Sequence, residues 1–376
     1  MSSFALYRLP HQQQVTLVEQ TADRPVEWTS CTALSGQQGF VVAPFAADSR
    51  CPIVLIRPDR LFTMSQEEVG LLRANPEFAP SKLPVCSVQT AGLLRPNCQF
   101  SGSPDERSSY AADFSRFHAR LQAGDFRKIV LSRCSVVPHK GKDNPVDLFC
   151  RACQRYPRLF VALVYTPQSG MWLTATPEIL LEGVGDEWRT IALAGTMQLE
   201  GDDLLGEGEH VTWSTKNIQE QRYVATYLTD CLERYAVDIR EEGPRTVRAA
   251  NLVHLRSDFT FHIYNKVRVG ELLQALHPTP AVCGLPKEQA YRFILENEHA
   301  PRLYYSGFMG PLNLSPAASS PAATHLYVSL RCMQITDQTY RLYAGGGLLK
   351  DSTEEQEWQE TEAKLQTMRM LNIKYN

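Results

Sequence analysis

The chain has 376 residues, of which 43% are hydrophobic and 21% charged, a composition typical of a globular protein rather than a disordered or fibrous one. Its 38 basic and 41 acidic residues give a net charge of -3. No basic excess therefore points to nucleic acid, and an anionic ligand must be held by a few local cations.

The first residues lack a basic segment followed by an apolar core, and no stretch approaches about 18 consecutive apolar residues, so we expect no signal peptide and no membrane span. The ten cysteines are scattered, which favours reduced thiols in a cytoplasmic protein.

The N-terminal third carries no motif that we can connect with chemistry. Short apolar segments such as GFVVAPF and PIVLIRP alternate with polar turns, which predicts β-strands. We assign 1–110 to an N-terminal β-rich portion of one fold and 111–376 to the region that carries the chemistry. The polar run 101–109 is typical of a connector, and the helical period after it ends at Gly124.

The remaining sequence predicts a mixture of strands and helices that do not alternate strictly. Apolar, β-branched segments indicate strands over 128–137, 159–166, 171–176, 178–183 and 188–196, and the turns between them favour an antiparallel sheet. Helices are expected over about 214–235 and 286–298, and strands over 325–335 and 340–347. A closing helix should begin at Ser352, with Glu355 completing a capping box. This order favours an α+β fold over a doubly wound sheet.

One CxxC pair, Cys150 and Cys153, lies inside the helix-like segment DLFCRACQRY. A redox or zinc site would require a strand-to-helix turn or a second pair at zinc spacing, and the sequence has neither. We therefore expect two small, buried thiols there.

Three carboxylates are candidates for a metal site. Glu220 aligns with Val224 on the apolar stripe of a helix, and it needs a cation if it is buried, although a half-solvated first helical turn is an alternative. Glu357 and Glu360 share a helix face with Lys364, which taken alone is typical of a solvated surface. Together the three glutamates suit Mg²⁺, which binds few protein carboxylates and keeps several waters. No His or Cys cluster suggests zinc or iron.

Other residues are chemically conspicuous but ambiguous when taken singly. Lys128 opens a strand and is either a solvated strand end or a general base, if desolvation or a neighbouring cation lowers its pKa. Glu178 is either an edge charge or an acid kept protonated by burial. Arg331 lies within an apolar strand and should require a carboxylate partner. The run Gly345–Gly347 would let a ligand approach the backbone closely, although a hairpin turn explains it equally well.

The order and wording of these segments are similar to those of a known family, the chorismate-utilising enzymes. That family comprises the anthranilate, aminodeoxychorismate, isochorismate and salicylate synthases. The resemblance covers about 115–376 and is carried, in order, by KIVLSR, ATPEILL, ALAGT, KNIQEQRYV, LVHLRSDF, HPTPAVCGLP, YSGFMG, SLRC, RLYAGGG and EWQETEAKL. It implies a single α+β domain of large antiparallel sheets flanked by helices, with the site between them.

Two positions narrow the resemblance to one subfamily. The strand lysine that matches Lys128 occurs where water is the nucleophile, and the nucleophilic lysine of the aminodeoxychorismate synthases is replaced here by Ala194. The chain therefore resembles an isochorismate synthase, an isomerase whose product serves menaquinone or catecholate siderophore synthesis. Because water replaces ammonia, no glutaminase subunit is expected.

The resemblance also implies roles for individual residues. Lys128 would deprotonate a water that adds at C2 of chorismate, and Glu178 would protonate the hydroxyl that leaves C4. Glu220 and Glu360, with Glu357 nearby, would hold Mg²⁺ against the ring carboxylate. Contacts to the rest of the substrate would come from Arg331, Lys364, Gly345 and Gly346 at the other carboxylate, and from Gly195, Thr196, His254 and Gly307 along the pocket.

Three alternatives remain open at the level of sequence. A salicylate synthase would use the same base and then eliminate pyruvate from isochorismate. An amine-forming synthase would require a glutaminase, which Lys128 and Ala194 argue against. A chorismate-binding regulator would keep the pocket without turnover. One departure affects the metal region, because relatives often read Glu-His where this chain has Glu220 followed by Gln221.

Overall fold

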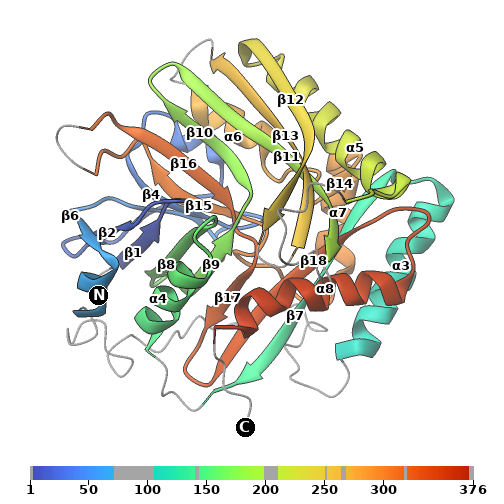
Figure 1. Ribbon diagram of the computed structural model, residues 1–376, viewed down its shortest axis with the longest axis horizontal. Helices are drawn as coiled ribbons and strands as arrows, with labels where there is room; N and C mark the ends of the chain where they lie inside the picture. The colour runs from blue at the N-terminus through green and yellow to red at the C-terminus, as the bar shows by residue number, and fades with distance from the viewer. Residues whose placement is uncertain are drawn as a thin grey trace.

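The computed structural model describes residues 3–71, 106–139, 144–198, 211–249, 252–263, 268–316 and 320–371. Its described strands form two nine-stranded antiparallel sheets with helices around them (Figure 1). This arrangement confirms the expected α+β fold. The first sheet runs in the order β14 (Gly284–Leu285), β7 (Lys128–Pro138), β18 (Thr339–Leu348), β17 (Cys332–Ile335), β9 (Gly170–Thr176), β8 (Phe160–Thr166), β1 (Ser3–Arg8), β2 (Gln14–Gln20) and β6 (Arg60–Ser65).

The second sheet contains the longest hairpin of the described chain, formed by β12 and β13 (Figure 1). Its order is β12 (Ala236–Ala249), β13 (Leu252–Ile263), β11 (Glu187–Gln198), β10 (Ile179–Val184), β16 (Ala323–Val328), β15 (Phe308–Leu312), β4 (Gly39–Ala43), β5 (Ile53–Ile56) and β3 (Val26–Trp28). The described helices are α1 (Gln66–Leu71), α3 (Glu106–Ala123), α4 (Pro145–Arg155), α5 (Thr215–Leu232), α6 (Val269–Leu276), α7 (Lys287–Asn297) and α8 (Glu354–Arg369), with a 3₁₀ turn η1 (Cys31–Leu34).

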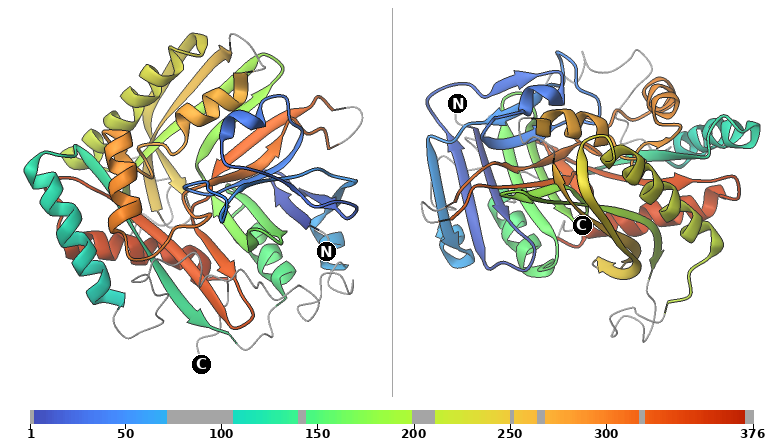
Figure 2. Two further views of the ribbon diagram at one scale, coloured as in Figure 1. Left: turned by 180° about the vertical axis from the view of Figure 1, so that it is seen from behind. Right: turned by 90° about the horizontal axis from the view of Figure 1, so that it is seen from above.

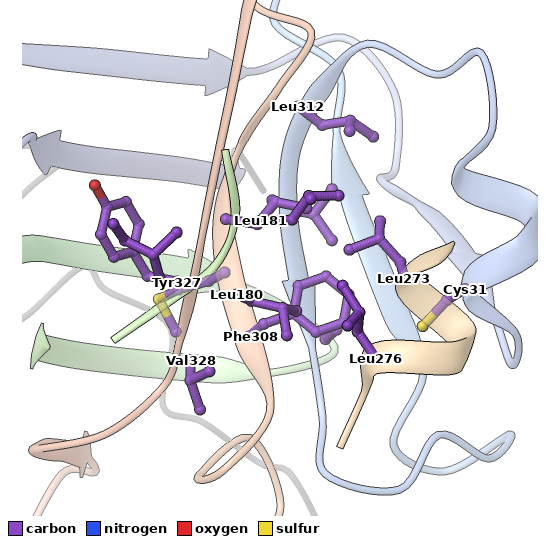
Figure 3. Close-up of a cluster of buried hydrophobic side chains, with 14 of the residues drawn as sticks. Cys31, Leu180, Leu181, Leu273, Leu276, Phe308, Leu312, Tyr327 and Val328 are labelled. Atoms are coloured by element: carbon purple, nitrogen blue, oxygen red, sulfur yellow. The ribbon is translucent and has the colours of Figure 1, made fainter. Parts of the chain in front are cut away.

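The two sheets pack face to face through aromatic side chains. Phe160 on β8 stacks on Tyr327 on β16, with ring centroids 4.3 Å apart, and Tyr7 on β1 meets Phe40 on β4 at 5.5 Å. All four rings are buried, and each buried side chain of this size contributes about 1.5–3 kcal/mol of hydrophobic stabilisation. Figure 3 shows the same core continuing beneath α6 and η1, where Leu273, Leu276 and Cys31 approach Leu180 and Phe308.

The N-terminal strands belong to these sheets and form no separate layer (Figure 2). β1 lies between β2 and β8, and β4 lies between β5 and β15. The guanidinium of Arg8, at the end of β1, is buried and donates to the carbonyls of Tyr156, Pro157 and Leu159. The first strand is thereby fixed to the turn between α4 and β8.

The helix positions are largely as predicted, and the largest error concerns the last helix. Ser214 caps α5 by accepting from the Asn217 N–H. α8, however, has Thr353 as its N-cap, without a side-chain hydrogen bond. The expected capping box of Ser352 and Glu355 is therefore wrong, because the Ser352 hydroxyl accepts from the Leu349 N–H in the preceding turn and Glu355 pairs with Arg107.

Two further predictions concern the connector at 101–109 and the CxxC pair. The connector 101–109 overlaps α3, which begins at Glu106, while 101–105 lies outside the described residues. Cys150 and Cys153 are buried free thiols on α4, as expected. None of the described helices is long and apolar enough to cross a membrane.

A buried ion pair supports the strand that carries Lys128. Arg302, after α7, is 4% exposed and pairs with Glu298 at 2.7 Å. Arg302 also donates to the carbonyls of Val130 and Val282, and Glu298 accepts from the Ser132 N–H. These bonds connect β7 with the loop between α6 and α7.

We predict that Arg302→Met lowers stability by about 3–5 kcal/mol, because it leaves Glu298 as an uncompensated buried charge. Urea unfolding followed by circular dichroism measures this change, and Arg292→Met, at an exposed position of α7, is the matched control. Replacing Glu298 by Met as well should restore part of the loss. Equal urea midpoints for the two single variants would contradict the prediction.

Candidate active site

A cavity between the two sheets is lined by residues of β7, β11, β13 and β18 and of helices α5 and α8. Figure 1 shows how these elements are arranged. The cavity brings together many of the residues singled out from the sequence. Its lining consists of Val130, Glu178, Leu193, Ala194, Gly195, Thr196, Glu220, His254, Ala281, Val282, Tyr305, Leu330, Arg331, Gly345, Gly347 and Lys364. A larger hollow lies at the far end of β11, around Trp188 and His262, and it contains none of the predicted site residues.

The glycine run lies within strand β18, so a hairpin turn is not its explanation. A Cβ atom on Gly347 would overlap the Glu220 carboxylate and lie 2.9 Å from Lys128 Cε. A Cβ on Gly346 would lie 3.0 Å from Glu357 Oε2 and 3.6 Å from Glu360 Oε1. The bare strand therefore lets carboxylates approach it from both α5 and α8.

Each of these glutamates is paired with a lysine. Lys128, which is fully buried, lies 2.9 Å from Glu220. Lys364 Nζ lies 2.5 Å from Glu360 and donates to the Gly345 carbonyl at 2.8 Å. The third pair joins Lys216, in the first turn of α5, to Glu357 on α8. Burial of three carboxylates is tolerated because three ammonium groups accompany them.

The lysines do not compensate the carboxylates equally, and the pKa values of Glu357 and Glu360 are shifted in opposite directions. Burial and the nearby charge of Glu360 together raise the pKa of Glu357 to about 7, against the opposing effect of Lys216. Burial also acts to raise the pKa of Glu360, but Lys364 outweighs it and the pKa is lowered. Burial opposes the charge of Lys216, yet Glu357 raises its pKa. Of the three lysine side chains, Lys216 is 26% exposed, whereas those of Lys128 and Lys364 are 0% and 10% exposed.

The geometry of the glutamates has features of a cation site. Glu357 Oε2 is buried and has no hydrogen-bond partner among the described residues, and it faces the cradle at Gly346 that a Cβ would narrow. Carboxylate oxygens are the ligands that Mg²⁺ takes. The chemistry of these donors therefore fits such an ion. Among the described residues, no group of three or more His, Cys, Asp or Glu side chains is already close enough together to hold a metal ion.

Lys128 lies behind the cavity wall rather than on it. Gly347 and Glu220 line the cavity, and the lysine reaches them from β7. Apart from the ion pair, its Nζ makes no directed hydrogen bond to the described residues. The ammonium is therefore neither the solvated strand end considered above nor fully satisfied by protein atoms.

Glu178 is an acid placed where its proton is retained near neutrality. It is 3% exposed, and burial raises its pKa to about 7 against the opposing charges of Lys128, Arg331 and Lys364. Cations on several sides of one buried carboxyl group indicate a site made for further negative charge.

Arg331 is buried, as expected, but its surroundings differ from the prediction in two ways. It lies between β16 and β17, which belong to different sheets, so 325–335 is not one strand. Its φ of 45° is unusual for a residue other than glycine, and such conformations concentrate at functional sites. The structure also gives it no carboxylate ion pair, since its described side-chain hydrogen bond is to His254 Nε2 at 3.1 Å.

His254 forms a short polar chain with Arg331. Its Nδ1 lies 3.1 Å from the Gly195 carbonyl and its Nε2 accepts from Arg331, which fixes the tautomer with the proton on Nδ1. Burial lowers the pKa of His254 well below its usual value, and Arg331 and Lys364 lower it further. A neutral imidazole thus orients a guanidinium that retains its charge for a ligand.

Gly195 occupies a bulge in the pairing of β11 with β13. Its φ is 73°, and a Cβ there would lie 3.1 Å from Asn217 Cβ on α5. Glycine therefore suits both the backbone conformation and the close approach of the helix. The bulge places Gly195 and Thr196 on the cavity wall.

Gly307 packs closely against the backbone of β4. It does not belong to the cavity lining, and a Cβ on it would overlap the Ala43 carbonyl. The expected position of Gly307 along the pocket is therefore not observed, and close packing of two backbones accounts for the glycine.

The sequence did not identify Tyr305, Lys216 or the loop at Ala281 and Val282 as site residues. The Tyr305 hydroxyl lies beside the bare face of Gly345. Tyr305 and the loop belong to the segments YSGFMG and HPTPAVCGLP quoted above. Lys216 lies one helical turn before Glu220. This spacing places both side chains on one face of the helix and could have identified Lys216 from the sequence.

Comparison with known proteins adds independent information. A family model described as chorismate binding enzyme matches residues 93–371. The isochorismate synthase EntC of Escherichia coli K12 is 27% identical over 271 residues, which cover 71% of this chain and 67% of EntC. The isochorismate synthase MenF of the same strain is 29% identical over 253 residues, covering 67% of this chain and 57% of MenF.

A solved structure supports the fold over nearly all of the chain. DhbC from Bacillus anthracis superimposes with a TM-score of 0.77 at 24% identity, covering 98% of this chain and 95% of that one. This match extends the likeness to the N-terminal strands, which the family model does not reach. Since the family model covers most of the chain, the protein belongs to the family of chorismate binding enzymes.

Proposed function

We propose that the chain is an isochorismate synthase, an isomerase that converts chorismate to isochorismate. The observation that carries the proposal is the joint placement of Lys128 and Glu178 beside a cation-lined cavity, with a non-nucleophilic Ala194 at its wall. The isochorismate synthases among the relatives support the same reaction.

In the proposed reaction, Lys128 acts in its uncharged amine form and accepts a proton from a water whose oxygen forms a bond to C2. The ring double bonds shift, the C4–O bond breaks, and Glu178 gives its proton to the departing hydroxyl, which leaves as water. One water is consumed and one released, so the reaction is an isomerisation. Glu178 has a pKa of about 7, so this acid is still protonated in part near neutral pH.

The substrate carboxylates would be held by groups that lack a full set of protein partners. Arg331, oriented by His254, has no described carboxylate ion pair and can bind one carboxylate with its guanidinium. Lys364 supports the same region next to the Gly345 backbone. Gly195, Thr196 and Tyr305 would shape the remaining wall.

Mg²⁺ would be held by Glu220, Glu357 and Glu360, whose oxygens gather around the bare strand at Gly346 and Gly347. When bound, the ion would neutralise the ring carboxylate and fix its orientation. Its charge would also favour the uncharged amine form of Lys128. The orphaned Glu357 Oε2 supports this assignment.

The expected setting follows from the same proposal. Water as nucleophile requires no ammonia donor, so no glutaminase subunit is needed. The eight described cysteines are buried free thiols, which suits a reducing cytoplasm. Isochorismate can supply either menaquinone or catecholate siderophore synthesis.

The decisive test is identification of the product formed from chorismate by the full chain. We expect isochorismate, formed only with Mg²⁺, and a rate loss of about 10²–10⁴-fold in Lys128→Ala, as is usual when a general base is removed. Chromatography with mass detection separates the candidates, and Lys350→Ala at an exposed site is the control.

Other outcomes would overturn the assignment. Salicylate formed without a separate lyase would make the protein a salicylate synthase. A product that requires ammonia would indicate an amine-forming enzyme. Bound but unchanged chorismate would indicate a regulator.

The pH profile tests Glu178. A pKa raised to about 7 means that the acid form is populated below pH 7 and is lost as the pH rises through that value. We therefore expect kcat/KM to fall on the alkaline side of about pH 7. Glu178→Gln should cost about 10²–10⁴-fold in kcat and abolish this limb. A wild-type profile that stays flat from neutral to alkaline pH would exclude Glu178 as the acid.

Gly347→Ala tests the bare strand. Its methyl group would displace Glu220 from Lys128, and a misplacement of about 1 Å in an active site can cost about 10²-fold in rate. We expect that loss in kcat/KM, measured with saturating Mg²⁺. Gly70→Ala, which meets no atom within 4 Å, should remain as active as the wild type, and similar losses in both variants would refute the steric argument.

A further inference from the structure

We propose that Lys216 is a built-in counter-ion of the metal-free site, whose ammonium group withdraws from Glu357 when a divalent cation binds. This inference rests on the proposed magnesium site, and it assigns Lys216 an exchange role rather than a permanent structural one. Lys216 would thus set the affinity of the site for the ion.

The position of Lys216 is the first part of the argument. It lies in the first turn of α5, one helical turn before Glu220, and pairs with Glu357 across the gap to α8. Glu357 is 1% exposed, and its other carboxylate oxygen has no partner among the described residues. Lys216 is therefore the ion-pair partner that the structure gives the most deeply buried of the three glutamates.

The second part is that Lys216 has the most exposed side chain of the three site lysines. Its side chain is 26% exposed, so four methylene groups can carry the ammonium into solvent without moving the helix. Lys128 is fully enclosed, and Lys364 is held by both Glu360 and the Gly345 carbonyl.

The third part is electrostatic balance. In the structure, each of the three glutamates already has a lysine ammonium group beside it. A divalent cation placed on the same carboxylates would repel the ammonium of Lys216 at short range. The ammonium and the metal ion therefore compete for Glu357, and departure of Lys216 relieves the repulsion.

Metal binding to Lys216→Met tests the exchange directly, without turnover. Titration calorimetry with MgCl₂, and with MnCl₂ as a second probe, should show at least about 5-fold tighter binding than in the wild type, the lower end of typical coupling between two sites. Lys216→Arg keeps the charge and should bind Mg²⁺ like the wild type. Lys350→Met, which removes an exposed lysine, is the matched control for net charge.

Thermal unfolding gives a second, independent readout. In EDTA, Lys216→Met should melt below Lys350→Met, because Glu357 loses its counter-ion. Added Mg²⁺ should raise its Tm by more than that of the wild type, since a ligand that binds the folded state more tightly stabilises it more.

The outcomes separate this inference from the function on which it rests. Equal or weaker Mg²⁺ binding by Lys216→Met, with normal binding by the wild type, overturns the exchange role and leaves the proposed function intact. Absence of Mg²⁺ binding in both proteins overturns the metal site and the exchange role together. If Lys216→Met does not fold, Lys216→Gln takes its place in the same titration.

Discussion

Burial of charge in matched pairs is the constraint on which this active site depends. A carboxylate removed from water is too costly to leave unpaired, and three of them converge on one strand here. Lys128, Lys216 and Lys364 make that convergence possible. Because each carboxylate lies beside an ammonium group, the buried charges largely offset one another.

The fold supplies the geometry that this pairing needs. β18 has glycines where α5 and α8 approach it, so the strand can be central to its sheet and still admit functional groups on both faces. The bulge at Gly195 and the positive φ of Arg331 also occur at the cavity wall. Departures from regular structure thus occur where the two sheets meet the site, while the aromatic contacts elsewhere hold the sheets together.

Much of this arrangement could be predicted from the sequence, for reasons that differ by residue. Strands and helices followed from periodicity, and Glu220 on the apolar stripe of α5 is indeed buried. Periodicity could not show that 325–335 divides between two sheets, since both halves are apolar. The capping box at Ser352 failed because a serine near a helix start can satisfy the preceding turn instead. Partners across the site, such as Lys216 with Glu357, are far apart in sequence and depend on tertiary packing.

The position of β18 and α8 in the chain has a consequence for biosynthesis. β18 separates β7 from β17, and α8 supplies Glu357, Glu360 and Lys364. During translation, which proceeds from the N-terminus at about 5–20 residues per second, β7 must wait on the ribosome for a partner strand that is made more than two hundred residues later. The nascent chain therefore carries an open sheet edge, and Lys216 lacks its partner Glu357, until β18 and α8 emerge. A nascent chain stalled before α8 would lack Glu357, Glu360 and Lys364 and so hold no complete site.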